Sequence, residues 1–177
     1  MRKLSLLALT LFSITMINGQ NLNETLKAQF IKDWERAKEY TNEYLNTMPA
    51  DKYSFKANDS VRSFAQQMLH LAQANIGLSA NGTDKARLWP GRRLEASATA
   101  QTKDSVVYFV NASYDFVIEG IKAMDFSKLE EKTGTGNFAN TRLAWLLKTF
   151  EHQTHHRGQT TIYIRLVGIK PPNEKLF

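Results

Sequence analysis

The sequence of 177 residues contains no cysteine. This absence excludes structural disulfides, thiolate metal ligands, a cysteine nucleophile and a lipid-modified cysteine anchor. Glycine and proline are sparse, at 9 and 4 residues, whereas 42% of the residues are hydrophobic. The composition therefore argues against disorder and predicts one compact domain with a hydrophobic core.

Several common catalytic motifs are missing as well. The sequence has no G-x-S-x-G elbow and no glycine-rich motif for phosphate or dinucleotide binding. The HExxH motif of zinc proteases is absent, because the residue after His152 is Gln153. We therefore identify no catalytic side chain and no residue for an organic cofactor.

Positive charge is in modest excess. The formal net charge is +6, and two of those charges, Arg2 and Lys3, belong to the first residues of the chain. Three further arginines surround Trp89, but no basic helix or series of stacking aromatics accompanies them. We expect a solvated loop at this point and no nucleic-acid partner.

The N-terminal residues have the order of a secretory signal peptide. A short basic start, Met1-Arg2-Lys3, precedes an apolar run from Leu4 to Ile17 that is too short to span a bilayer comfortably. Cleavage after the small residue Gly19 would leave Gln20 as the new N-terminus. We therefore expect a signal peptide at 1–19, a periplasmic or secreted protein, and no stable membrane insertion after cleavage. An uncleaved membrane tether is the alternative.

Four segments show the spacing of amphipathic helices, with apolar residues recurring at steps of three and four. Pro49 ends the first segment, Asp59 or Ser60 caps the second, and Thr102 caps the third. No strand pattern competes. The sequence thus predicts an all-α four-helix bundle within residues 20–177, with helices over about 26–48, 103–124 and 138–167. The second helix starts near 60, and Gly77 and the run Ser79 to Gly82 mark its end.

The connection between the second and third helices predicts the topology of the bundle. It spans about 22 residues, which fully extended reach ~70 Å, whereas a 20-residue helix is only ~30 Å long. A crossover of this length makes the second and third helices parallel, and the shorter connections on either side suit antiparallel neighbours. The expected order is up-down-down-up.

Three of the four histidines lie between residues 152 and 156. His152 and His156 are four residues apart, so on a helix they point about 40° from each other and could bind one ion. Hydrogen bonds across the core are the other way to satisfy such imidazoles. His155 points about 100° away from His156, which favours a place at the rim or in solvent.

A third ligand would have to come from another helix, and His70 is the remaining histidine. The residues on its face of the second helix fit two interpretations equally well, a solvated face or a groove of small residues with room for an ion. Periodicity alone favours the solvated face. These neighbours are Ser63, Gln67, Ala74 and Gly77.

His70 in the middle of the second helix, together with His152 and the run His155-His156-Arg157-Gly158-Gln159 in the fourth, resembles the DinB/YfiT-like family of metal-dependent enzymes. The resemblance covers essentially the whole chain after the leader. It implies three metal ligands, His70, His152 and His156, with zinc or nickel as the ion. Some members are thiol-dependent transferases or isomerases, a function that export would disfavour because cofactor thiols are cytoplasmic.

Three neutral imidazoles leave at least one coordination position open, as in catalytic metal sites. We therefore expect a metal-dependent hydrolase or transferase that acts on an unknown small molecule. The alternative is a non-catalytic module that binds a small ligand or a metal. Gln159 and Tyr163 would lie near the site, and Arg157 would pair with a substrate anion or with a carboxylate on a neighbouring helix. The sequence leaves a homodimer open.

Overall fold

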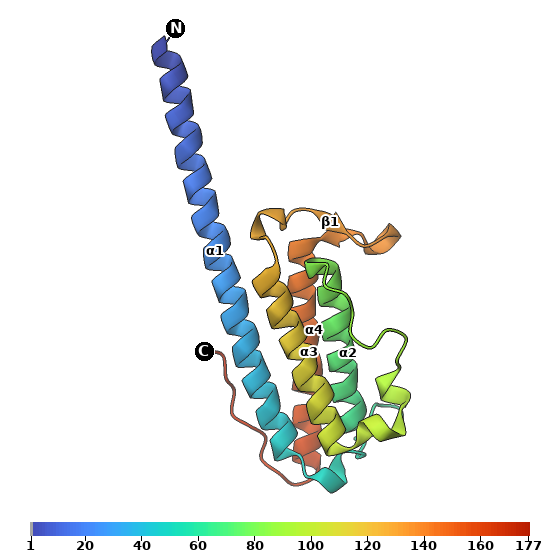
Figure 1. The fold of residues 1–177 in the computed structure, drawn as a ribbon. Coiled ribbons are helices and arrows are strands. Elements are labelled where there is room, and N and C mark those ends of the chain that lie inside the picture. The colour runs from blue at the N-terminus through green and yellow to red at the C-terminus, as the bar shows by residue number, and fades with distance from the viewer. Residues whose placement is uncertain (1) are drawn as a thin grey trace.

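Four long helices lie side by side in the computed structural model, which describes residues 2–177 and side chains from Leu22 onward (Figure 1). The expected signal peptide at 1–19 lies outside the residues with described side chains. No described helix combines the length and the apolar character needed to cross a membrane. The helices are α1 (Arg2–Thr47), α2 (Phe64–Thr83), α3 (Lys103–Ala123) and α4 (Arg142–Leu166).

The helix directions confirm the predicted bundle. Helices α2 and α3 run in the same direction, and α1 and α4 run in the opposite one (Figure 1). The crossover between α2 and α3 carries two short 3-10 helices, η2 (Leu94–Ala96) and η3 (Ala98–Gln101). Three others are η1 (Ala50–Lys52), η4 (Phe126–Lys128) and η5 (Gly136–Phe138). The fold is all-α, in an up-down-down-up order with a long crossover.

The hydrophobic core lies along the predicted apolar stripes. On α1 the buried stripe includes Trp34, Thr41 and Met48, and on α3 it includes Tyr114 and Ile121. Each helix thus covers its apolar face with its neighbours, and the polar faces remain in solvent.

The start and end of α2 differ from the prediction. The N-cap is Ser63, whose hydroxyl accepts a hydrogen bond from the backbone N–H of Gln66, while the Gln66 side chain accepts one from Ser63 N–H. Val61, predicted to point inward, is 38% exposed because it precedes the helix. The helix continues through Gly77 and ends at Thr83, one residue beyond the stretch from Gly77 to Gly82 that marked its predicted end.

The beginning of α4 differs too. Two short strands, β1 (Lys132–Thr133) and β2 (Asn140–Thr141), pair antiparallel before it, in a stretch where we predicted no strand. Helix α4 therefore begins at Arg142 rather than near Phe138, with Thr141 as its N-cap. A two-residue strand has no alternating pattern that a sequence could reveal.

Candidate metal centre

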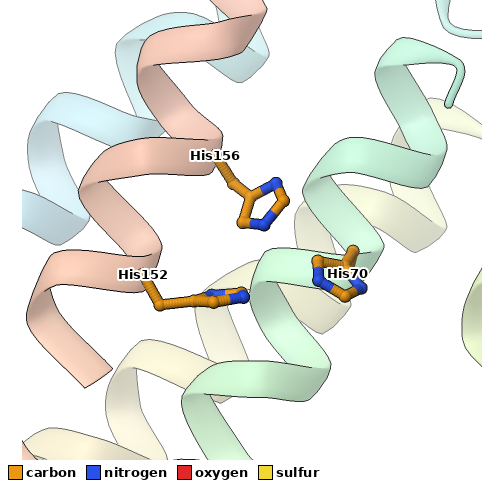
Figure 2. A group of neighbouring side chains, drawn as sticks. All are labelled: His70, His152 and His156. Atoms are coloured by element: carbon orange, nitrogen blue, oxygen red, sulfur yellow. The ribbon is translucent and has the colours of Figure 1, made fainter. Parts of the chain in front are cut away.

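Three imidazoles from two helices converge between α2 and α4 (Figure 2). His70 comes from α2, and His152 and His156 come from α4 one turn apart. One ring nitrogen of each lies within 4.8 Å of the others, so the group could hold a metal ion. The ring centroids are 4.4 Å apart for His152 and His156, and 4.5 Å for His70 and His156.

The face of α2 that carries His70 packs against α4. Ser63 and Gln67, which share that face, are 3% and 6% exposed. The interpretation of this face as solvated is therefore wrong for Ser63 and Gln67, whereas Ala74 and Gly77 are half-buried. Packing between the two helices places His70 opposite the histidine pair, although His70 itself keeps 27% of its side chain exposed.

Glu95 forms a hydrogen bond with the His70 ring at Nδ1. Its Oε1 lies 2.6 Å from Nδ1 of His70, and its Oε2 accepts a hydrogen bond of 2.6 Å from Nε of Arg62. A carboxylate can only accept here, so Nδ1 of His70 carries the proton and Nε2 keeps its lone pair free. Sequence reasoning missed Glu95, because it lies in the crossover and no spacing relates it to His70.

Gln67 fixes the tautomer of the His156 ring in the same way. Its side-chain carbonyl Oε1 accepts a hydrogen bond of 2.8 Å from Nδ1 of His156, which leaves Nε2 of that ring free. Tyr163, with its ring buried, donates a hydrogen bond of 2.7 Å to the backbone carbonyl of Arg62. Tyr163 therefore braces the start of α2.

His152 has an unsatisfied nitrogen. Its Nδ1 is buried and has no hydrogen-bond partner among the described residues. Buried polar atoms without a partner are costly, so the packing of the described residues leaves His152 incompletely satisfied. With a free Nε2 on His70 and another on His156, the donor set suits a divalent ion that prefers imidazole ligands.

The environment keeps two of the rings neutral. Burial lowers the pKa of His156 to about 3, with smaller contributions from His152 and His70. Burial and the neighbouring histidines also lower the pKa of His152. Burial would raise the pKa of the Glu95 carboxyl, but hydrogen bonds from Arg62 and His70 outweigh it and lower that pKa. At neutral pH the rings of His152 and His156 are thus in the neutral, metal-binding form.

His155 stands outside the group. It is exposed, and its Nε2 lies 3.0 Å from the side-chain Nε2 of Gln159. The sequence-based expectation of a place at the rim agrees with this position. Gln159 makes its described contact with His155, whereas the Tyr163 hydroxyl accepts a hydrogen bond of 3.5 Å from Nε2 of Gln67, the residue that bonds to His156.

Arg157 does not pair with a carboxylate in the described part of the chain, contrary to one of our expectations. It is buried, donates a hydrogen bond of 2.9 Å to Oε1 of Gln153, and lies over the ring of Tyr40 at 4.6 Å. Gln153 in turn accepts a hydrogen bond of 2.8 Å from the hydroxyl of Tyr114. Arg157 therefore belongs to a polar network inside the bundle, on another face of α4 from His156.

Two cavities flank the histidines. One has a volume of about 480 Å³ and is lined by Arg62, His70, Gln73, Ala74, Arg93, Glu95 and Ala96. The other has a volume of about 470 Å³ and is lined by Leu78, Lys148, Glu151, His152 and His155. A small molecule in either cavity would contact one of the three imidazoles.

Comparisons with known proteins agree with this architecture. A sequence model of the DinB family matches residues 17–176, and no curated protein matches the chain. The fold is similar to that of a DinB-like protein from Bacillus cereus ATCC 10987, at 16% identity over 82% of this chain and 95% of that one, with a TM-score of 0.70. It is also similar to a DinB-like protein from Bacillus subtilis, at 18% identity over 82% and 96% of the two chains, with a TM-score of 0.63.

Proposed function

This chain belongs to the DinB family, and from that premise we propose that it is an exported metal-dependent enzyme, a hydrolase or a transferase. Its divalent ion, zinc or nickel, would be held by His70, His152 and His156. The observation that carries the proposal is the convergence of one nitrogen from each of these rings within 4.8 Å. The hydrogen bonds that Nδ1 of His70 and Nδ1 of His156 form support it, because they leave Nε2 of each ring free.

The residues around the rings prepare them to hold an ion. Glu95 and Gln67 each accept a hydrogen bond from an Nδ1, and so direct the free Nε2 of His70 and of His156. Because imidazole ligands are neutral, they do not cancel the charge of a divalent ion. Such an ion supplies Lewis-acid chemistry, the polarisation of a substrate oxygen or sulfur.

A metal-loading experiment tests the site. The purified protein would be stripped with a chelator, reloaded with zinc, nickel or manganese, and screened against esters, amides and thiol adducts. We expect about one equivalent of metal in the parent protein, and turnover that is lost in His156→Ala. Turnover that persists unchanged in His156→Ala would remove the site from the reaction.

Export has a test of its own. The protein recovered from the cell envelope should have an N-terminal mass that begins near Gln20, because cleavage is expected after Gly19. An intact Met1 on the recovered protein would contradict the proposed cleavage. This outcome would leave the metal site unaffected.

One observation favours a second candidate, a non-catalytic module that binds a metal or a small ligand. Both carboxylate oxygens of Glu95 are engaged, and Glu151 forms an ion pair with Lys148 at 2.7 Å. Among the residues that line the two cavities, no carboxylate is free to act as a general base. Stoichiometric metal uptake without turnover on any of the three substrate classes would support this candidate.

A further inference from the structure

The cavity between α2 and the crossover shares the side chain of His70 with the metal centre. His70 and Glu95 belong both to the wall of this 480 Å³ cavity and to the group that prepares the metal site. The volume is typical of pockets for small molecules. A molecule bound there would lie against the His70 side chain.

The charges that line this cavity do not balance. Its wall contains two guanidinium groups, Arg62 and Arg93, against one carboxylate, Glu95. That carboxylate already has both oxygens engaged, one by His70 and one by Arg62. Arg93 is exposed and forms no ion pair among the residues that the structure describes. One positive charge therefore remains available.

The other polar groups of the wall do not compensate this charge. The side chain of Gln73 accepts a hydrogen bond from the backbone N–H of Leu94 and donates one to the backbone carbonyl of Arg92, so it secures the crossover. Ala74 and Ala96 add small apolar surface. A divalent ion held by neutral imidazoles would increase the positive potential further.

The cavity on the other side of the histidines lacks this excess. Its one lysine, Lys148, is paired with Glu151, and Leu78 contributes apolar surface. Arginine is the side chain best suited to recognise carboxylate and phosphate oxygens. From this asymmetry, and resting on the proposed metal site, we propose that the protein takes a small molecule with an anionic oxygen group, which Arg93 binds at the crossover.

Two ligands of the same shape and different charge test the proposal. Benzoate and benzamide would be titrated into the zinc-loaded protein by calorimetry. We expect benzoate to bind at least about tenfold more tightly, and Arg93→Gln to weaken benzoate about fivefold or more. Benzamide binding should not change in that variant, because benzamide carries no charge for Arg93 to pair with. Zinc uptake should not change either, because Arg93 is not one of the proposed metal ligands.

A neighbouring arginine provides the matched control. Arg92 lies with its guanidinium over the ring of Phe109 at 5.7 Å and lines a different cavity, so Arg92→Gln should bind benzoate like the parent protein. Equal affinity for benzoate in Arg93→Gln and the parent protein, or no benzoate binding, would overturn the proposal. Absence of zinc uptake would instead refute the proposed function. Benzoate affinity would then be compared between metal-free Arg93→Gln and the metal-free parent protein, and this comparison would decide the anion site alone.

Discussion

The three imidazoles of the site are supported in different ways at the scale of single residues. A carboxylate holds His70, an amide holds His156, and Nδ1 of His152 has no partner among the described residues. An acceptor behind a ligand ring fixes its tautomer and orientation and makes the opposite nitrogen more basic. The contribution of Glu95 to metal affinity is therefore open to measurement without any substrate.

Glu95→Gln should weaken metal binding about 10- to 100-fold, because a neutral amide is a poorer acceptor for His70 Nδ1 and loses its ion pair with Arg62. Competition with a chromophoric chelator would measure the affinity. The matched control is Glu151→Gln, since Glu151 is exposed and paired only with Lys148. Equal affinities in the two variants would contradict the role of Glu95.

The metal-free protein should lose stability in acid through His156. Burial lowers the pKa of this ring to about 3, whereas an unfolded histidine titrates near ~6.5. Between about pH 6.5 and pH 3 the unfolded chain therefore binds more protons than the folded one. The stability that neutral His156 contributes is complete above pH 6.5 and is lost as the pH falls toward 3. Urea unfolding should show a free energy about 2 kcal/mol lower at pH 5 than at pH 7.5. The difference in the free energy of unfolding between pH 5 and pH 7.5 should be smaller in His156→Gln.

At the scale of elements, the sequence located the helices better than their ends. Apolar residues at helical spacing mark the middle of a helix, because a whole stripe must be buried. A cap depends on one side-chain oxygen, and for the second helix we predicted Asp59 or Ser60 rather than Ser63. Ser63 is the cap because Gln66, three residues later, completes the reciprocal pair of hydrogen bonds.

Ser63→Ala should therefore lower the free energy of unfolding by about 1 kcal/mol, as N-cap substitutions generally do. Ser60→Ala is the control at the position that we first considered. The Ser60 hydroxyl bonds only to the side chain of exposed Asn58, and its removal should change stability by less than about 0.5 kcal/mol. Denaturant unfolding of both variants would distinguish them, and a larger loss for Ser60→Ala would place the cap at the earlier position.

At the scale of the whole molecule, a buried polar network joins three helices. The hydroxyl of Tyr114 on α3 donates to Gln153 on α4 and lies 2.7 Å from Oγ1 of Thr41 on α1. Arg157 extends the network by its hydrogen bond to Gln153. Because these side chains are buried, each unsatisfied group would be costly, and the network favours a single arrangement of the helices.

Tyr114→Phe should lower the free energy of unfolding by about 1–2 kcal/mol, since it removes one buried hydroxyl from two partners. Metal uptake should be unaffected, because the network and the histidines lie on different faces of α4. Tyr108→Phe removes the same atom from a side chain that is 62% exposed, and it should be close to neutral. Thermal unfolding monitored by circular dichroism would compare the two, and equal losses would argue against the network.

The sequence by itself determined the all-α class, the parallel pair formed by the long crossover, and the pairing of His152 with His156. These features depend on the spacing of residues along one helix or on the length of a connection. Both quantities can be read directly from the sequence. The tertiary structure decided which face His70 presents, since periodicity favoured solvent and packing against α4 brought the ring to the pair. It also decided the partners Glu95, Gln67 and Gln153, because contacts between elements depend on how helices and loops pack, which spacing along the chain does not record.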